Sequence, residues 1–244
     1  MIYPDGLKML QAYLCNDWEM NLKLIEIAEK SNFDGLVITV DAQVLGTRRK
    51  EIMHRLDSSK YIFPVLEEMA ALSKNGHDGP KERQSYLKNR DLSLNWETIA
   101  KIRKLTKLKI VLKGILHPQD AAIAVNYCDA IYISNHGGRQ LDTVPATIEV
   151  LPQITAVVRK LNKDFPILID GGVRTGNDIF KCLALGANFV FIGRPVAYSL
   201  IQGEEGVDHM VNILRDELTR CMILNGTKSL REINTEYIGF RSKL

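Results

Sequence analysis

The sequence predicts an α/β fold of the (β/α)8-barrel family, with about six of the eight βα units present in this chain. Short, continuous apolar runs alternate with segments of helical period, which is typical of a parallel sheet covered by helices. Nearly every apolar run also ends in a residue with functional chemistry, and in a barrel all the strand ends meet at one rim. These residues are Tyr13, Asp41, Lys113, His136, Asp170 and Arg194.

A doubly wound sheet is the alternative fold. Such a sheet concentrates its chemistry where the strand order reverses, and its first turn usually carries a glycine-rich fingerprint. No such fingerprint follows the first predicted strand, Met9–Leu14. The barrel is therefore the preferred prediction.

The expected elements follow one another as strand and helix. The predicted strands are Met9–Leu14, Gly35–Asp41, Lys109–Lys113, Ala130–Ser134, Pro166–Asp170 and Phe189–Ile192. The predicted helices are Trp18–Ser31, one beginning near Trp96, one that Pro118 opens, Thr147–Leu161, Gly176–Leu185 and Gly206–Leu224. The barrel interior is expected to contain Val37, Val111, Ile131, Leu168 and Val190.

Composition places the chain among soluble globular proteins. It has 244 residues, of which 45% are hydrophobic and 25% charged, and this length suits one large α/β domain. A net charge of +3 without a basic stripe argues against nucleic-acid binding, and the absence of a long apolar stretch or leader argues against a membrane or secretory role. The widely spaced cysteines predict neither a metal site nor a disulfide framework; they are Cys15, Cys128, Cys182 and Cys221.

One segment interrupts the repeat. We predict a single domain over residues 1–244, with an irregular, charged, lid-like insertion at residues 47–92. A loop of this length inside a compact domain is usually functional or disordered. For its distal half, residues 73–90, a solvated insertion is the favoured interpretation.

The most informative stretch is Ile133–Asp142. An apolar run ends there in Ser134 and Asn135, followed by His136, two glycines and Arg139. A titratable His and a fixed cation at a strand's carboxyl end are typical of active-site edges in parallel sheets. The planar guanidinium suits a carboxylate or phosphate. The alternative is a His and an Arg in an ordinary turn.

The last two predicted strands carry a phosphate-binding pattern. They end in Asp170-Gly171-Gly172-Val173-Arg174 and in Gly193-Arg194-Pro195. Barrels that bind phosphorylated ligands often hold the phosphate with the loops after strands 7 and 8. Glycine turns expose backbone N–H groups, and the arginines supply positive charge. The alternative is that these are structural glycines and surface arginines.

These motifs together resemble a known family. The nonapeptide Ser134–Asp142 is similar to the signature of the FMN-dependent 2-hydroxy acid oxidases and dehydrogenases, such as glycolate oxidase and lactate oxidase. The other matching blocks fall in family order: Gln11-Ala12-Tyr13, Thr39-Val40-Asp41, Leu45-Gly46-Thr47-Arg48, Lys113-Gly114, Asp170-Gly171-Gly172-Val173-Arg174 and Phe191-Ile192-Gly193-Arg194-Pro195. The resemblance implies a flavoprotein oxidoreductase that converts a small (S)-2-hydroxy acid to a 2-oxo acid, with oxygen as acceptor and hydrogen peroxide as product.

The resemblance also implies a role for each site residue. His136 matches the catalytic base and Asp41 the carboxylate that stabilises the imidazolium. Tyr13 matches a phenol that contacts the substrate, and Arg139 and Arg48 match the clamp on its carboxylate. The matching FMN contacts are Gln11, Thr39, Lys113, Ser134, Asp170, Gly171, Gly172, Arg174, Gly193 and Arg194. No metal is implied, and a homo-oligomer is compatible with the family.

The carboxyl-terminal tripeptide matches a targeting signal. Ser242-Lys243-Leu244 matches the peroxisomal targeting tripeptide, so an import receptor is an expected partner and the peroxisome the expected location. Peroxide production suits that compartment.

The amino terminus departs from the family pattern. Family barrels begin well before the strand that carries Gln11 and Tyr13, so we expect this chain to be an amino-terminally truncated member. Two alternatives to an active oxidase stay open. One is a non-catalytic remnant that binds FMN weakly or not at all. The other is a different FMN-barrel chemistry, which the set of His136, Arg139, Asp41 and Arg48 disfavours.

Overall fold

The computed structural model describes residues 6–47, 49, 53–54 and 90–239. Arg48, most of the 47–92 segment and Ser242-Lys243-Leu244 lie outside the described residues, so the predictions made for them stay predictions. The chain divides into two compact units, Met1–Lys113 and Gly114–Leu244, and each is described by itself.

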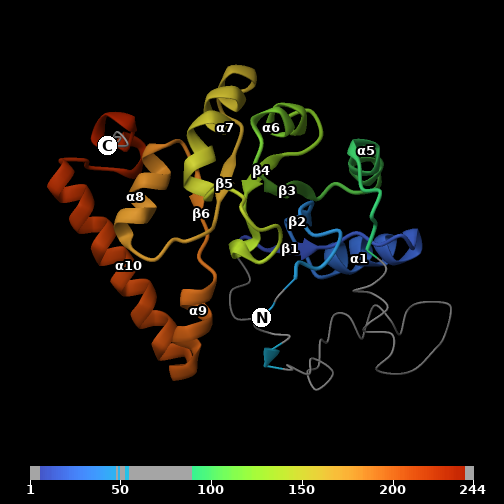
Figure 1. The fold of residues 1–244 in the computed structure, drawn as a ribbon, viewed down its shortest axis with the longest axis horizontal. Helices are drawn as coiled ribbons and strands as arrows, with labels where there is room; N and C mark the ends of the chain where they lie inside the picture. The colour runs from blue at the N-terminus through green and yellow to red at the C-terminus, as the bar shows by residue number, and fades with distance from the viewer. Residues whose placement is uncertain (1–5, 48, 50–52, 55–89, 240–244) are drawn as a thin grey trace. The chain divides into compact units, whose positions relative to one another are not determined.

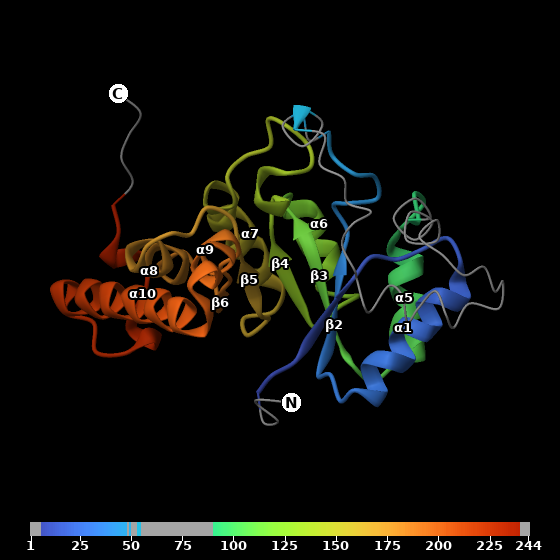
Figure 2. The ribbon, with the colours of Figure 1, turned by 90° about the horizontal axis from the view of Figure 1, so that it is seen from below.

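The first unit contains three parallel strands and two described helices (Figure 1). In chain order these are β1 (Met9–Ala12), α1 (Trp18–Lys30), β2 (Gly35–Thr39), α5 (Trp96–Leu105) and β3 (Lys109–Ile115). Gln11 lies opposite Val37, and Thr39 lies opposite Lys113. The α1 and α5 helices lie side by side, as Figure 2 shows, and the Lys101 ammonium lies 3.5 Å from the centroid of the Trp18 ring.

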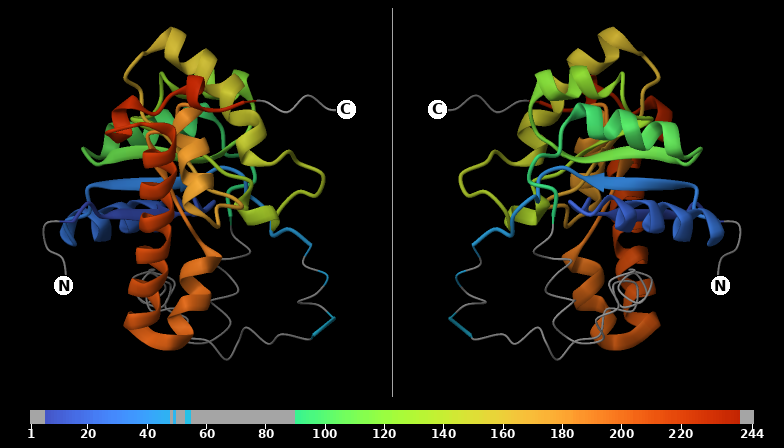
Figure 3. Two further views of the ribbon diagram at one scale, coloured as in Figure 1. Left: turned by 90° about the vertical axis from the view of Figure 1, so that its left-hand side faces the viewer. Right: turned by 90° about the vertical axis from the view of Figure 1, so that its right-hand side faces the viewer.

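The second unit repeats the strand–helix alternation. Its elements are α6 (Pro118–Ala124), β4 (Ala130–Ile133), the 3-10 turn η2 (His136–Gly138), α7 (Thr147–Leu161), β5 (Ile167–Ile169), α8 (Gly176–Ala184), β6 (Phe189–Val190), α9 (Arg194–Ser199), η3 (Leu200–Gln202), α10 (Gly203–Asn225), η4 (Leu230–Glu232) and η5 (Thr235–Tyr237). The long α10 helix packs along α8, as Figure 3 shows, and Glu217 Oε2 accepts a 2.7 Å hydrogen bond from the Gly176 N–H.

Local sequence explains where several helices begin and end. Asp17 caps α1 by accepting from the Glu19 N–H, and Pro118 occupies the first turn of α6, where no donor is needed. Thr175 and Asp178 form a reciprocal capping box at the start of α8. Gly226, with a φ of 74°, ends α10 in the left-handed conformation that favours glycine.

The strand order follows the chain order, β1-β2-β3-β4-β5-β6. A doubly wound sheet would need a reversal of this order, and the described strands contain none. Parallel strands in chain order, with a helix between successive strands, form the topology of a (β/α)8 barrel, and the described residues contain six of its strands.

The strands are shorter than the sequence predicts, with one exception. Tyr13, Asp41, Ser134 and Asp170 lie just beyond the ends of their strands. The expectation that β3 ends at Lys113 is wrong, because β3 continues to Ile115. The α7 helix has the predicted bounds, Thr147–Leu161.

The residues predicted to fill the barrel interior do not all lie on one face of the sheet in the second unit. Ile131 pairs with Ile167, whereas Leu168 pairs with Tyr132, so Ile131 and Leu168 point to opposite faces of the sheet. Val190, opposite Ile169, shares the face of Ile131. Strands buried on both faces are apolar throughout, so their sequences lack the alternation that would reveal which side faces inward.

Candidate functional site

Three polar side chains of the first unit lie on neighbouring strands. Gln11 Nε2, in β1, donates a 3.1 Å hydrogen bond to Thr39 Oγ1 at the end of β2. Thr39 in turn lies opposite Lys113 in β3, and the Val40 N–H donates to the Lys113 carbonyl at 2.8 Å. Thr39 and Lys113 are both buried. The structure therefore brings together three of the residues predicted to contact the cofactor, on the neighbouring strands β1, β2 and β3.

Tyr13 and Asp41 follow β1 and β2, and a residue that the sequence analysis missed connects their segments. The Arg90 guanidinium lies 4.3 Å from the Tyr13 ring centroid, and its Nη1 donates a 2.6 Å hydrogen bond to the Ala42 carbonyl. Arg90 is only 5% exposed, so the expectation of a solvated insertion over residues 73–90 is wrong at this position. No local pattern marks Arg90, because its contacts come from residues 48 and 77 positions away.

His136 lies in a strained turn just after β4. Its φ is 57°, and Gly137 and Gly138 continue the left-handed conformation at 66° and 71°. The His136 N–H donates to Ser134 Oγ at 3.1 Å, and the Gly138 N–H donates to the Asn135 carbonyl at 2.9 Å. A left-handed conformation is costly for a residue with a Cβ, and strain of this kind is concentrated at functional sites. Arg139 follows the turn and is exposed.

The strand ends after β5 and β6 present backbone rather than side chains. Gly171 and Gly172 have φ values of 100° and 78°. A Cβ on Gly171 would lie 2.8 Å from Thr147 Oγ1 and 3.0 Å from Asn135 Oδ1, so this glycine is packed tightly. A Cβ on Gly172 or Gly193 would meet nothing within 4 Å. These two glycines therefore leave the backbone open to a ligand.

The two predicted phosphate-binding arginines are both exposed. Arg194 begins α9, and its Nη2 donates a 2.9 Å hydrogen bond to the Gly137 carbonyl. Because this bond joins the start of α9 to the turn after β4, the guanidinium is held near the His136 segment with further donors left for an anion. Arg174 lies one residue before Thr175, which caps α8, so its charge stands at a helix amino terminus.

Three buried side-chain oxygens of this unit have no hydrogen-bond partner among the described residues: Asn135 Oδ1, Thr155 Oγ1 and Asp170 Oδ1. Buried acceptors are normally paired, because an unpaired one loses its hydration without compensation. Thr155 lies within α7, whereas Asn135 and Asp170 belong to segments that directly follow strands, β4 and β5. Asn135 and Asp170 therefore fit a ligand that brings hydroxyl or N–H donors.

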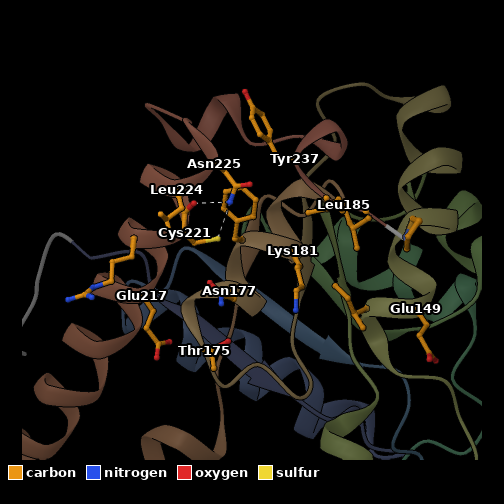
Figure 4. A pocket seen from close by; sticks show the side chains of 16 residues that line it. Glu149, Thr175, Asn177, Lys181, Leu185, Glu217, Cys221, Leu224, Asn225 and Tyr237 are labelled. Carbon is orange, nitrogen blue, oxygen red and sulfur yellow. Dashed lines mark hydrogen bonds between the residues drawn. The ribbon is translucent and has the colours of Figure 1, made fainter. Parts of the chain in front are cut away.

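A cavity of about 1030 Å³ lies elsewhere in the second unit, on its helices (Figure 4). Side chains of α7, α8 and α10 line it, among them Glu149, Lys181 and Cys221, and Asn225 Nδ2 donates to the Cys221 carbonyl at 2.8 Å beside it. No residue predicted for the site lines this cavity. The candidate chemistry therefore lies at the strand ends and not in this cavity.

Within the part of the chain that the structure describes, no group of three or more His, Cys, Asp or Glu side chains could hold a metal ion. Nor does any described helix have the length and apolar character needed to cross a membrane.

The chain is similar in sequence to known oxidases. It is 41% identical to 2-hydroxyacid oxidase 2 of Mus musculus over 239 residues, which are 97% of this chain and 65% of that protein. It is 39% identical to glycolate oxidase of Spinacia oleracea over 236 residues, covering 96% of this chain and 63% of the relative. The chain thus spans just under two thirds of the length of these curated relatives.

A solved structure supports the fold. A crystal structure of a lactate oxidase from Pediococcus acidilactici matches with a TM-score of 0.81 and 36% identity, covering 95% of this chain and 60% of that one. The prediction of a partial (β/α)8 barrel is confirmed by this similarity and by the strand order.

The family model for FMN-dependent dehydrogenases matches residues 3–239. FMN is the cofactor of this family, and two features of the second unit fit the phosphate and the polyol chain of such a molecule. The open backbone at Gly172 and Gly193, with Arg174 and Arg194 nearby in sequence, suits a phosphate. The unpartnered oxygen of Asp170 suits a polyol hydroxyl. The chain belongs to the FMN-dependent dehydrogenase family, whose members include the 2-hydroxyacid oxidases that it resembles.

Proposed function

We propose that this protein oxidises a small (S)-2-hydroxy acid to the 2-oxo acid with FMN, and that oxygen accepts the electrons and yields hydrogen peroxide. The observation that carries the proposal is the strained turn after β4. It presents His136 between Ser134 and two left-handed glycines, with Arg139 next to it. The relatives named 2-hydroxyacid oxidase and glycolate oxidase support the same reaction class.

Bound FMN would supply the two-electron acceptor, and the protein side chains would handle the proton and the carboxylate. In this proposal His136 takes a proton from the 2-hydroxy acid, and Asp41 stabilises the imidazolium that results. Arg139 and Arg48 hold the substrate carboxylate with their planar guanidinium forks, while Tyr13 donates to the substrate.

The remaining predicted residues would hold the cofactor. Gln11, Thr39, Lys113 and Ser134 are assigned to the flavin ring and its chain, and a buried lysine there would stabilise negative charge on the reduced ring. The phosphate end is assigned to Gly172, Arg174, Gly193 and Arg194, with Asp170 and Gly171 before them.

The test is spectroscopic. The purified chain should show the visible absorbance of bound flavin, and glycolate or lactate should bleach it in the absence of oxygen. Air should restore the absorbance and release one peroxide per turnover. Bound flavin that no 2-hydroxy acid bleaches would contradict the reaction but leave the cofactor assignment intact.

A second candidate is a non-catalytic remnant that binds FMN weakly or not at all. Two properties of β6 favour it: this strand is only two residues long, and the side chain of its Phe189 is 56% exposed. Joining the chain to the upstream third of a relative should then raise solubility and flavin content together. Stoichiometric flavin and turnover in the chain by itself would exclude this candidate.

We also propose peroxisomal import through Ser242-Lys243-Leu244, which an import receptor would bind. Deleting the three residues should move a fluorescently tagged protein, with its tag at the amino terminus, from peroxisomes to the cytosol. Unchanged peroxisomal targeting would mean that the tripeptide is incidental. A homo-oligomer is a further proposal, which sedimentation of the flavin-loaded protein would test.

A further inference from the structure

The Arg90 side chain joins two segments of the first unit that follow strands. Its guanidinium carbon lies over the Tyr13 ring, 4.3 Å from the centroid, and its Nη1 donates a 2.6 Å hydrogen bond to the Ala42 carbonyl. Tyr13 follows β1, and Ala42 lies three residues after β2. Because the hydrogen bond fixes one end of the planar guanidinium, the whole group is held against the ring.

The backbone of Arg90 is joined to the same segment. Arg90 pairs with Cys15 in an antiparallel bridge, and the Asp91 N–H donates to the Leu14 carbonyl at 2.9 Å. The two residues that follow Tyr13 are therefore held by the backbone of residues 90–91, while the Tyr13 ring is covered by the Arg90 side chain. Ring and guanidinium are thus placed relative to each other by contacts at both levels.

Stability alone does not explain an arginine at this position. Arg90 is buried, and its Nε has no hydrogen-bond partner among the described residues. A buried donor without a partner is unfavourable, and a buried charge needs more compensation than an apolar side chain of similar length. A methionine would cover the ring without either cost. The charged, planar group therefore has a use that packing does not supply.

That use follows from the contact with Tyr13. A guanidinium is attracted to the face of an aromatic ring, and its planar shape stacks there. With one face covered in this way, the ring is restricted to one orientation, and the direction of its hydroxyl is restricted with it. Direction matters because a hydrogen bond weakens steeply as its angle departs from the preferred range.

We infer that Arg90 is a positioning residue for the oxidation, which acts by holding the Tyr13 ring so that its hydroxyl points at the substrate. This inference rests on the proposed function, because that function assigns the Tyr13 phenol to the substrate. Arg90 lies in none of the sequence motifs of the site.

The experiment is a double-mutant cycle on the flavin-loaded protein: wild type, Arg90→Met, Tyr13→Phe and the double variant. One readout is kcat/KM for whichever of glycolate and lactate reduces the flavin faster. The other needs no turnover: it is the dissociation constant of the corresponding product, glyoxylate or pyruvate, from the change in flavin absorbance. We expect Arg90→Met to lower kcat/KM and weaken product binding by about tenfold each, the size of one hydrogen bond. In the Tyr13→Phe background it should have no further effect.

Three further variants separate this role from packing. Arg90→Lys keeps a cation for the ring and should hold kcat/KM within about threefold of wild type, although lysine is as unbranched as methionine. Arg90→Gln keeps a donor for the Ala42 carbonyl but no charge, and should lose about as much as Arg90→Met. Ser93→Ala removes the 2.7 Å hydrogen bond from Ser93 Oγ to Asp91 Oδ1 in the same segment and should change neither readout. Circular dichroism and the FMN dissociation constant should match wild type throughout.

The outcomes are distinct. Unchanged kcat/KM and product binding in folded Arg90→Met or Arg90→Gln would overturn the inference and leave the proposed function standing. An equal loss in the native and the Tyr13→Phe backgrounds would also overturn it, since Arg90 would then act on something other than the phenol. A wild-type flavoprotein that neither glycolate nor lactate reduces would overturn the proposed function, and the inference with it.

Discussion

The strand ends of the two units differ in what they present. In the first unit they carry side chains that contact one another, such as Gln11 with Thr39, and Tyr13 with Arg90. In the second unit they carry left-handed backbone, at His136 and at Gly171 and the glycines beside them, together with buried acceptors that have no described partner.

This difference separates structural from ligand-binding roles. A polar side chain that a protein partner satisfies already has a structural reason to be there. A buried acceptor at a strand end without such a partner, such as Asn135 Oδ1 or Asp170 Oδ1, has no structural reason of this kind, and it indicates where ligand atoms belong. Substitutions at the unpartnered acceptors of the second unit should therefore reduce function more than stability, whereas those at paired residues of the first unit should lower stability as well.

The largest expected effect is that of His136→Gln. Removing the proposed base should slow flavin reduction by a 2-hydroxy acid by about 10²- to 10⁴-fold, while FMN stays bound, because the base acts on the substrate. Stopped-flow absorbance under anaerobic conditions measures this rate. His209→Gln, an exposed position on α10, is the matched control. A normal reduction rate in His136→Gln would remove this residue from the role of base.

Arg139→Lys should come next. An ammonium keeps the charge but cannot form the two parallel hydrogen bonds of a guanidinium fork, so kcat/KM for 2-hydroxy acids should fall about 10- to 100-fold. Steady-state peroxide release gives the value. Arg231→Lys, an exposed change in η4, should have no effect. Identical kinetics in the two variants would show that the substrate carboxylate binds elsewhere.

Gly171→Ala tests the packed glycine of the second unit. Its φ of 100° and the 2.8 Å approach of a Cβ to Thr147 Oγ1 should together cost about 1–3 kcal/mol of unfolding free energy, measured with urea. Gly193→Ala is the contrast, because a Cβ there meets nothing within 4 Å. It should cost much less stability and instead weaken FMN more than riboflavin. Equal effects of the two substitutions on stability would contradict the distinction between packed and open glycines.

Alkaline pH should weaken the second unit through Cys182. Burial raises the pKa of this thiol from 9.0 to about 12, so above pH 9 the unfolded chain loses a proton that the folded protein retains. Stability therefore falls as pH rises, by about 1.4 kcal/mol per pH unit between roughly pH 9 and 12 from this group. Urea unfolding at several pH values should show a shallower slope for Cys182→Ala than for Cys221→Ala. The same slope in both variants would exclude Cys182 as the cause.

The smallest expected effect belongs to the first unit. Gln11→Ala removes the hydrogen bond to Thr39 Oγ1 and should cost about 0.5–1.5 kcal/mol of unfolding free energy in the protein without flavin. Because Thr39 is buried, its hydroxyl would lose a partner in the variant. Urea unfolding of wild type and variant in parallel gives the difference. No loss of stability, together with a large loss of flavin affinity, would reverse the comparison between the two units.

Much of the fold was determined by local sequence. The bounds of α7, the cap of α1 at Asp17 and the opening of α6 at Pro118 all follow from residues within one or two turns. The order of the motifs and their places at strand ends also came from the sequence, because apolar runs and the glycine turns that follow them are adjacent in the chain. The family followed from these motifs and is confirmed.

Only the tertiary structure decided which side chains of each strand share a face of the sheet, and which residues distant in sequence contact one another. The apolar sequence of β4 and β5 does not show that Tyr132 and Leu168 share one face and Ile131 the other; the register of the parallel ladder does. Arg90 is buried because its guanidinium lies against the Tyr13 ring, 77 positions away in the sequence. Contacts of this kind depend on which strands become neighbours, and no local periodicity records that choice.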